Sequence, residues 1–368
     1  MIIGVPKEIK ISENRVGMTE AGARQLTKEG HTIIIEKDAG VGSGITNEQF
    51  EKAGAKIIDS KKEVYSKADM IMKVKEPLPA EYELMKENQI LYTYLHLAAE
   101  PTLTKVLCER KVKSIAYETI QLENGSLPLL TPMSEVAGRM ATQIGAFYLQ
   151  KDHGGKGILM GGVTGVKPAK VTIIGGGVVG TNAAKMAVGL GAHVTILDVN
   201  TARLEYLDDI FQGRCETLFS SAKNIEDSVR ESDLVVGGVL ITGQKAPTLV
   251  SKELVSQMSK GSVVVDVAVD QGGCIETCRP TSHTNPTYEI DGVIHYCVPN
   301  MPGVVPRTST YALTNVTLKY ASMLAAMGVE DAVSKNKALM KGLNVYNGYI
   351  CYEPVARDLN MEYKAYKI

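Results

Sequence analysis

The 368-residue sequence predicts an α/β fold built from two doubly wound domains, one of them inserted into the other. Short runs of β-branched residues alternate with helix-like segments from the first residues onward, a pattern typical of parallel sheets covered by helices. A glycine-rich turn lies between two such runs near the middle of the chain. After Pro299 we expect no further strands, only helices that return to the first domain, so the first domain is discontinuous.

The first domain is expected to alternate strands and helices throughout. Thr19 is a suitable N-cap for a helix over Glu20–Glu29, and Gly30 would end it. Two more helices are expected, over Asn47–Ala53 and from Glu100-Pro101 onward. The expected strands are Ile2–Val5, Thr32–Glu36, Lys56–Ile58, Asp69–Val74, Gln89–Leu95 and Lys113–Tyr117.

The second domain is expected to begin with a long helix from Ser134, after an irregular link over Leu127–Thr131. Two C-terminal helices, over Thr308–Met327 and Lys335–Tyr346, would then return to the first domain. The predicted domains are residues 1–128 with 306–368, and residues 129–305. Six strands, the number in the full dinucleotide fold, are expected over Val171–Ile174, His193–Leu197, Glu216–Phe219, Leu234–Val239, Ser262–Val267 and Val293–Val298.

The segment Lys170–Asn200 carries the strongest functional signal. Its glycine turn, Gly175-Gly176-Gly177-Val178-Val179-Gly180, fits the G-x-G-x-x-G pattern between a strand and a helix. In that pattern the first glycine permits a tight turn, the second lets the backbone approach a pyrophosphate, and the third lets helix and strand pack closely. The alternative is a turn that binds nothing, but both flanking strands and a later acidic residue are in place. We therefore expect a Rossmann dinucleotide-binding domain over residues 129–305, with the substrate held by the other domain.

Asp198 ends the second of these strands, about 20 residues after the glycines. A carboxylate there accepts hydrogen bonds from ribose hydroxyls and repels a 2′-phosphate, so the sequence favours NAD over NADP. Arg203 is a counter-signal, because an arginine near this place can accept that phosphate. We give more weight to Asp198, since it lies on the strand end itself.

Ligands of open α/β sheets bind outside the carboxyl ends of the strands. The residues that follow the strands of the second domain are therefore the remaining candidates for nucleotide contacts. They are Ser220, Val239, Leu240, Val267, Ala268, Val269, Asp270, Val298, Pro299, Asn300 and Met301.

The same rule selects three residues of the first domain, Arg15, Lys75 and His96, which would face one cleft. Taken singly, the two cations are equally well explained as solvated loop or strand-end charges, and His96 as a core histidine. Together they suggest a cation pair that grips a substrate carboxylate, with a histidine that handles protons near neutral pH. Asp270 would approach from the dinucleotide side, where a hydride is delivered.

The composition excludes several other classes of function. A net charge of -1 gives no electrostatic argument for nucleic acid or an anionic membrane. We find neither a signal-peptide layout at the N-terminus nor an apolar window of about 18 residues. The six scattered cysteines suggest free thiols in a reducing cytoplasm. We expect no metal site, because the spacing in the one Cys/His-rich stretch, Cys274, Cys278, His283, His295 and Cys297, matches no zinc pattern.

Seven segments, in this order, resemble the alanine dehydrogenase family over essentially the whole chain. They read GVPKEIKISENRVGMTEAG, VKEPLPAEY, YLHLAAE, TPMSEVAGRMA, VTIIGGGVVGTNAA, VDVAVDQGG and VPNMPGVVPRTST. The resemblance implies reversible NAD-dependent oxidative deamination of L-alanine to pyruvate and ammonia, in a hexamer of bilobed subunits. It implies substrate contacts through Arg15 and Lys75, acid/base catalysis by His96, and Asp270 as a second catalytic residue. The positions implied to line the NAD site are Ser134, Val178, Asp198, Arg203, Ser220, Leu240, Asp270, Asn300 and Met301.

Three alternatives remain at this point. The NAD-binding component of a proton-translocating transhydrogenase resembles both lobes, although Arg15, Lys75 and His96 suit a small carboxylate. A saccharopine-type dehydrogenase is a further relative, but the VPNMPG stretch fits the alanine family better. A catalytically inactive nucleotide sensor would bind NADH without turnover. The sequence leaves open the tolerance for other small amino or keto acids and the physiological direction of the reaction.

Overall fold

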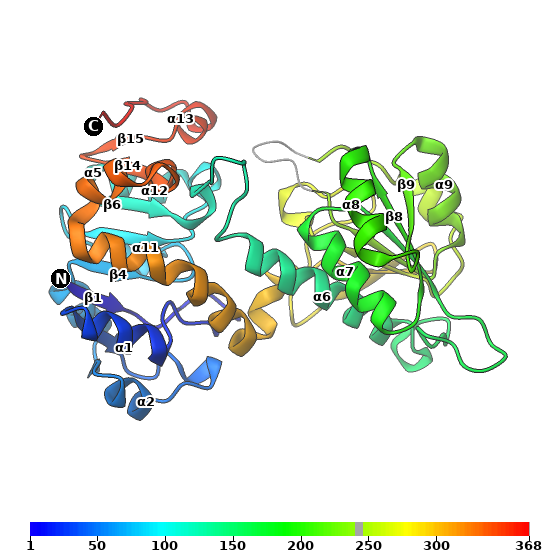
Figure 1. Cartoon of the computed structure of the whole chain (residues 1–368), viewed down its shortest axis with the longest axis horizontal. Helices are drawn as coiled ribbons and strands as arrows, with labels where there is room; N and C mark the ends of the chain where they lie inside the picture. The colour runs from blue at the N-terminus through cyan, green and yellow to red at the C-terminus, as the bar shows by residue number, and fades with distance from the viewer. Residues whose placement is uncertain (240–245, 368) are drawn as a thin grey trace. The chain divides into compact units, whose positions relative to one another are not determined.

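The structure, a computed structural model of the whole chain, describes residues 1–239 and 246–367 (Figure 1). The chain divides into two compact units, each with one mainly parallel sheet. Unit 1 comprises Met1–Met133 and Gly303–Ile368, and unit 2 comprises Ser134–Pro302. The expected α/β fold class is confirmed.

Unit 1 contains all six strands expected from the sequence, and these pair in parallel. The strands of this sheet are β1 (Ile2–Val5), β2 (Thr32–Glu36), β3 (Lys56–Ile58), β4 (Met70–Met72), β5 (Ile90–Thr93), β6 (Lys113–Ala116), β14 (Leu343–Tyr346) and β15 (Tyr349–Ile350). Their order is β15-β14-β6-β5-β4-β1-β2-β3. The carboxyl ends of β1, β4 and β5, which are neighbours, therefore meet at one edge.

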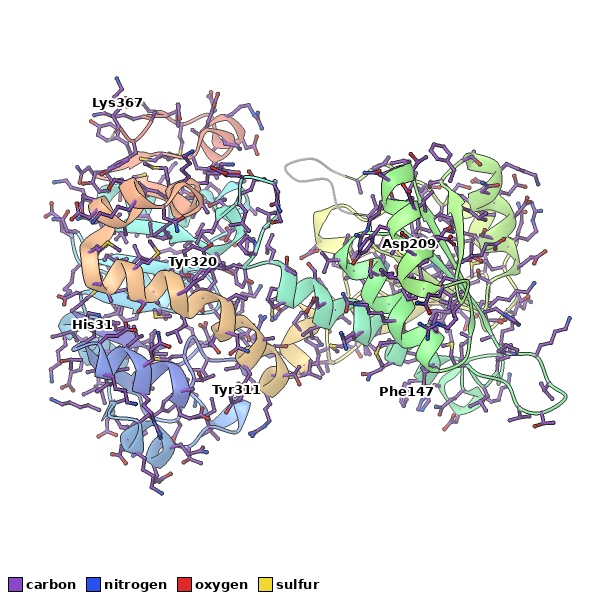
Figure 2. The ribbon with its side chains drawn as sticks, in the orientation of Figure 1. His31, Phe147, Asp209, Tyr311, Tyr320 and Lys367 are labelled. Atoms are coloured by element: carbon purple, nitrogen blue, oxygen red, sulfur yellow. The ribbon has the colours of Figure 1, made fainter. Side chains whose placement is uncertain are left out.

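The helices of unit 1 include the three expected in its N-terminal part. They are α1 (Glu20–Lys28), α2 (Asn47–Lys52), α3 (Lys61–Lys67), α4 (Pro79–Tyr82), α5 (Pro101–Glu109), α11 (Pro306–Lys335), α12 (Lys337–Gly342) and α13 (Glu353–Leu359). The Thr19 hydroxyl caps α1 by accepting the Gly22 N–H at 3.2 Å. The α1 and α11 helices lie side by side in front of the sheet (Figure 1), and the Tyr311 hydroxyl donates to Glu20 across them at 2.8 Å. Figure 2 labels Tyr311 and the buried Tyr320 on α11.

The expectation of no strand after Pro299 is wrong. The helix expected over Lys335–Tyr346 ends at Gly342, and the chain then forms β14, which pairs antiparallel with both β6 and β15. The turn between β14 and β15 is Asn347-Gly348, with φ values of 49° and 84°. Asn-Gly with both φ values positive is the preferred two-residue hairpin turn, a local signal that competes with helix continuation.

Unit 2 contains the six expected parallel strands and one additional edge strand. They are β7 (Lys170–Ile174), β8 (His193–Asp198), β9 (Glu216–Phe219), β10 (Leu234–Gly237), β11 (Val263–Asp266), β12 (Thr287–Ile290) and β13 (Val293–Tyr296). The additional strand, β12, joins β13 through a second hairpin turn, Asp291-Gly292, with φ values of 53° and 84°. The sheet order is β12-β13-β11-β10-β7-β8-β9, so the parallel strands follow the dinucleotide-binding order with its reversal between β7 and β10.

Among the residues that the structure describes, five helices accompany this sheet. They are α6 (Thr131–Tyr148), which begins in the last residues of the first segment of unit 1, α7 (Val178–Gly189), α8 (Thr201–Phe211), α9 (Ala222–Glu231) and α10 (Lys252–Ser256). The α6 helix packs closely on the start of α7: a Cβ built on Gly138 would lie 2.2 Å from the Val179 carbonyl oxygen. Arg139 adds a hydrogen bond to Asn182 at 3.1 Å. The middle of α6 is therefore in contact with the first turns of α7.

Three further features bear on the classes of function that the sequence suggests. Among the residues that the structure describes, no helix is both long enough and apolar enough to cross a bilayer. The same residues include no group of three or more His, Cys, Asp or Glu side chains placed to hold a metal ion. All six cysteines carry free thiols.

Candidate functional site

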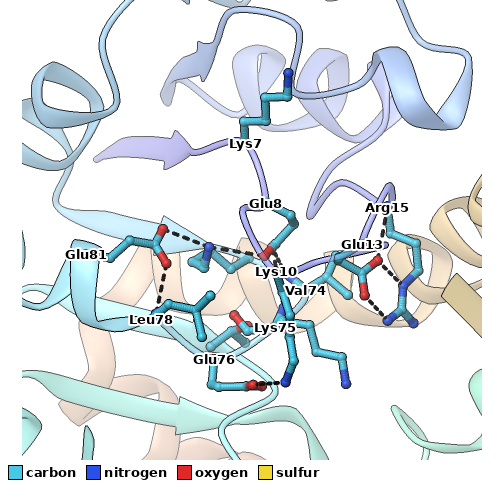
Figure 3. Close-up of polar contacts among 12 residues, drawn as sticks. Lys7, Glu8, Lys10, Glu13, Arg15, Val74, Lys75, Glu76, Leu78 and Glu81 are labelled. Carbon is cyan, nitrogen blue, oxygen red and sulfur yellow. Dashed lines mark hydrogen bonds and ion pairs between the residues drawn. The ribbon is translucent and has the colours of Figure 1, made fainter. Parts of the chain in front are cut away.

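Arg15 lies in the segment after β1 and is buried, with 2% of its surface exposed. Its guanidinium forms a two-point ion pair with Glu13, from Nε to Oε1 at 2.6 Å and from Nη2 to Oε2 at 2.5 Å (Figure 3). Burial opposes the charge, but the hydrogen bonds to Glu13 outweigh it and raise the pKa of Arg15. The solvated-charge interpretation is therefore wrong. The Nε–Nη2 edge of the guanidinium is engaged within the protein, so it cannot also grip a substrate carboxylate.

Lys75 follows β4, and its backbone is held from two sides. Glu8 Oε1 accepts the Val74 N–H at 2.6 Å and the Lys75 N–H at 3.4 Å, and the Thr93 hydroxyl donates to the Lys75 carbonyl at 3.0 Å. The Lys75 ammonium is half-buried and, within residues 1–239 and 246–367, has no hydrogen-bond or ion-pair partner (Figure 3). Burial, and then the nearby Arg15 charge, lower the pKa of Lys75. The Glu76 and Glu13 carboxylates act on the Lys75 charge from a distance and do not outweigh burial and Arg15. A half-buried cation with no directly bonded partner is a place where an anionic ligand gains free energy of binding.

Sequence reasoning missed the buried network behind Lys75. Lys73 Nζ lies 3.1 Å from Glu8 and 2.9 Å from Glu81, and all three side chains are 2% exposed or less. Burial opposes the charge of Lys73, but the two carboxylates outweigh it and raise the pKa of Lys73. Burial also raises the pKa of Glu8, whereas Lys73 and Lys61 outweigh burial and lower the pKa of Glu81, so Glu81 is the better ion-pair partner. The sequence feature that could have indicated this network is Lys73, a lysine directly after the buried strand β4.

His96 follows β5 and is exposed, so the core-histidine interpretation is wrong. Its backbone is left-handed, with φ 50° and ψ 38°, an uncommon conformation for a residue with a side chain. The imidazole lies parallel to the Tyr94 ring, with 6.0 Å between ring centroids and 7° between planes. The backbone N–H of His96 donates to the Glu118 carboxylate at 2.7 Å. The sequence analysis did not identify Glu118, as it did not identify Glu8 and Glu81.

In unit 2 the glycine turn has the geometry of a phosphate-binding turn. Gly175 has a φ of 97°, and a Cβ on Gly180 would lie 1.9 Å from the Gly175 carbonyl oxygen. A Cβ on Gly177 would meet nothing within 4 Å, so that face of the turn is open. It lies at the N-terminus of α7, a helix of 12 residues, whose first N–H groups favour an anion. These residues fit the pyrophosphate of a dinucleotide.

Asp198 and Arg203 bind the N–H and the carbonyl of one residue of this turn, Gly176. Asp198 Oδ2 accepts the Gly176 N–H at 2.7 Å, and Arg203 Nε donates to the Gly176 carbonyl at 2.6 Å. Arg203 Nη2 also donates to the Thr181 hydroxyl at 2.7 Å, and the guanidinium lies over the Tyr206 ring. Each Asp198 oxygen keeps lone pairs for further donors. The carboxylate therefore fits ribose hydroxyls, whereas Arg203 is engaged by the protein.

The other nucleotide candidates lie at the same sheet edge, because they follow parallel strands. Ser220 follows β9 and donates its N–H to the Asp198 carbonyl at 3.0 Å. Val239 follows β10, and the remaining residues after β11 and β13 are Val267, Ala268, Val269, Asp270, Val298, Pro299, Asn300 and Met301. Leu240 lies outside the described residues.

Asp270 is exposed in a short 3-10 helix, Val269–Gln271, that follows β11. The loop that leads to it is held by Asp266, which accepts the Ala268 and Cys274 N–H groups, each at 3.1 Å. Burial raises the pKa of Asp266 to about 6. Sequence reasoning missed this residue, although it ends a strand.

The chain matches two family models along most of its length: "Alanine dehydrogenase/PNT, N-terminal domain" over residues 4–137, and "Alanine dehydrogenase/PNT, C-terminal domain" over residues 141–353. It is 61% identical to an alanine dehydrogenase of Methanococcus maripaludis, covering 99% of this chain and 98% of that protein. It is 60% identical to an alanine dehydrogenase of Bacillus subtilis, covering 99% and 96%. A solved L-alanine dehydrogenase matches with a TM-score of 0.96 and 54% identity, covering 98% and 99% of the two chains. A transhydrogenase from Sinorhizobium meliloti shares the fold, with a TM-score of 0.83 at 23% identity over 95% of this chain and 100% of that one.

Replacing Lys73 tests whether the buried network holds the fold of unit 1. Lys73→Met leaves Glu8 and Glu81 buried without their cation, so we expect the free energy of unfolding to fall by about 3–5 kcal/mol. The control is Lys67→Met, which breaks an exposed pair with Glu63 and should cost at most about 1 kcal/mol. Urea unfolding followed by circular dichroism measures both. Equal unfolding midpoints for the two variants would contradict this account.

Proposed function

The chain belongs to the alanine dehydrogenase and pyridine nucleotide transhydrogenase family, and on this premise we propose that it catalyses the reversible NAD-dependent oxidative deamination of L-alanine to pyruvate and ammonia. The observation that carries this proposal is the half-buried Lys75 ammonium beside Arg15, without a partner among the described residues. A small carboxylate substrate would be the direct ion-pair partner of this ammonium. The full-length identity to curated alanine dehydrogenases supports the choice of alanine.

We assign the substrate contacts to Arg15 and Lys75. Glu13 occupies the Nε–Nη2 edge of Arg15 and keeps the guanidinium charged and oriented, so the substrate contact is assigned to the remaining Nη1 side. Lys75 binds the same carboxylate and donates to the carbonyl oxygen that develops as pyruvate forms. The lowered pKa of Lys75 makes its proton easier to share with that oxygen.

His96 is the proposed acid/base. When NAD is bound, it supplies the nicotinamide carbon that takes up the hydride leaving the alanine Cα. The substrate is then an iminium ion, and His96 removes a proton from the water that attacks it. Alanine reacts with its amino group neutral, so that loss of the hydride gives this iminium ion. His96 returns the proton to the nitrogen and takes the hydroxyl proton of the carbinolamine as the C–N bond breaks and ammonia leaves. Release of that proton to solvent restores His96, so one proton is released per turnover. Exposure of the imidazole lets it exchange protons with solvent between turnovers.

The NAD site is assigned to unit 2. The N–H groups at the start of α7 would hold the pyrophosphate, and Asp198 the ribose hydroxyls of the adenosine. Asp270 is assigned to the nicotinamide side, where its carboxylate assists the reaction. The other assigned contacts are Ser134, Gly175, Gly177, Val178, Val179, Gly180, Arg203, Ser220, Val239, Leu240, Val267, Ala268, Val269, Val298, Pro299, Asn300 and Met301.

We further propose a homohexamer located in the cytoplasm. The hexamer rests on the family resemblance alone. The cytoplasm is supported by six cysteines that all carry free thiols, as expected in a reducing compartment.

The decisive experiment follows NADH absorbance at 340 nm, a property of the cofactor, with purified protein, pyruvate and ammonium, omitting each in turn. We expect NADH to be consumed only when pyruvate and ammonium are both present. Consumption without ammonium would indicate a keto-acid reductase. Binding of NADH without consumption would favour the transhydrogenase-like or sensor interpretation.

His96→Ala tests the acid/base assignment. Because proton transfer by a positioned side chain contributes roughly 10²–10⁴-fold, we expect kcat to fall at least ~10²-fold. Affinity for NADH, measured by fluorescence titration, should not change. His193→Ala is the matched control, since His193 is exposed at the amino end of β8. Near-normal turnover of His96→Ala would refute the assignment.

Asp198→Ala tests the NAD site. Loss of charge-assisted hydrogen bonds, each worth about 1.5–3 kcal/mol, should weaken NAD binding roughly 10- to 100-fold. Asp209→Ala is the control, because Asp209 is an exposed carboxylate on α8 (Figure 2). Isothermal titration calorimetry measures both affinities. Asp198→Ala with the affinity of the control would show that the ribose contact is misplaced.

A further inference from the structure

Glu118 contacts the backbone of the residue proposed as acid/base. Its Oε1 accepts the His96 N–H at 2.7 Å and the Leu95 N–H at 3.2 Å, and its Oε2 accepts the Leu95 N–H at 3.2 Å. The carboxylate thus receives two successive backbone donors where the chain leaves β5. A charged acceptor makes such hydrogen bonds shorter and stronger than a neutral one.

The sheet register places Glu118 beside His96. The β5 and β6 strands are parallel, and Thr93 lies opposite Ala116. Both residues therefore follow their strands by a few positions and emerge at the same edge. After β6 the chain turns at once into a short 3-10 helix, Tyr117–Thr119, which turns the Glu118 carboxylate toward the end of β5.

The contact matters because His96 is in a conformation that a histidine rarely adopts. A φ of 50° brings its Cβ close to the backbone and persists only where surrounding contacts hold it. The Leu95 and His96 N–H groups both point to Glu118, while the His96 carbonyl accepts the Ala99 N–H at 2.9 Å. Glu118 is therefore the side chain that holds the N–H side of this turn. The backbone angles in turn set the direction in which the imidazole leaves the chain.

The neighbouring Tyr94 fixes the other side of the turn. Its hydroxyl donates to the Leu129 carbonyl at 2.5 Å, and its ring lies parallel to the His96 imidazole. With Tyr94 anchored in this way, the direction of the His96 imidazole depends on the backbone angles at Leu95 and His96 and on the side-chain torsions of His96. The contact with Glu118 restrains the backbone angles, and the stacked Tyr94 ring lies beside the imidazole.

We propose that Glu118 is a positioning residue for the reaction: its carboxylate holds the left-handed turn at His96 and thereby aims the imidazole at the substrate. This rests on the proposed acid/base role of His96. Glu118 itself touches no reacting atom in this scheme. A displacement of about 1 Å in a catalytic group can cost about 10²-fold in rate, so loss of the restraint should be measurable in kcat.

The test is a double-mutant cycle in the pyruvate and ammonium assay, with the wild type, Glu118→Ala, His96→Ala and the double variant. Glu118→Ala should lower kcat about 10²-fold while the Kd for NADH changes less than about twofold. In the His96→Ala background, the same substitution should lower kcat less than about twofold, because residues that act through one another are not additive. Glu109→Ala, an exposed carboxylate at the end of α5, is the control and should match the wild type.

A second variant keeps the test decisive if Glu118→Ala does not fold. Glu118→Gln retains one carbonyl acceptor but places an NH2 group against one backbone N–H. We therefore expect kcat to fall about tenfold in the wild-type background. In the His96→Ala background the same substitution should not lower kcat. Equal losses in both backgrounds, or no loss in either glutamate variant, would overturn the proposal. Full activity of His96→Ala alone would instead refute the acid/base assignment, so the two failures are distinguishable.

Discussion

The hydrogen bond from the Val74 N–H to the Glu8 carboxylate is the contact on which the candidate edge of unit 1 depends. It joins the segment after β1 to the segment after β4, at 2.6 Å and out of solvent. A buried carboxylate is tolerated only when donors and a cation satisfy it, and here Lys73 is that cation. Because Glu81 holds Lys73 from the other side, the backbone of Lys75 is rigid while its ammonium has no partner among the described residues.

The same kind of contact occurs at each of the three residues proposed to meet the substrate. Glu13 orients the Arg15 guanidinium, Glu8 holds the backbone at Lys75, and Glu118 holds the backbone at His96. In each case a carboxylate restrains a residue to which we assign a role in the reaction. Pre-organisation of this kind lowers the cost of ordering side chains when the substrate binds.

The sequence predicted the parallel strands well, because they follow from local patterns, and the strand ends in turn select the site candidates. β-branched runs mark parallel strands, and the residues after such strands meet at one edge, which selects Arg15, Lys75 and His96. The partners of these residues could not be identified in this way, because Glu8 and Glu13 are two among 41 acidic residues until the fold sets their distances. Glu118 directly follows the predicted strand Lys113–Tyr117. The rule that ligand-binding residues follow the strands would therefore have selected it, had the rule been applied to this strand as well.

The missed hairpins have a different cause. The turns Asn347-Gly348 and Asp291-Gly292 carry the sequence signal of a two-residue hairpin. Both hairpins lie at a sheet edge, where short strands have few apolar residues and resemble loops or helix ends. The antiparallel β14 strand was hidden further by the helix α12, which precedes it without a break. Local turn chemistry, and not hydrophobic periodicity, was the informative pattern there.

The two units show why one topology serves two ligands. The order β3-β2-β1-β4-β5-β6 in unit 1 matches β9-β8-β7-β10-β11-β13 in unit 2. In unit 2 the first strand leads into glycines and an open helix N-terminus, which favour a pyrophosphate. In unit 1 the first strand leads into Glu8 and Glu13, whose charges repel a pyrophosphate but hold Lys73 and Arg15. The residues after the first strand, and not the strand order, therefore decide that unit 1 suits a small carboxylate and unit 2 a dinucleotide.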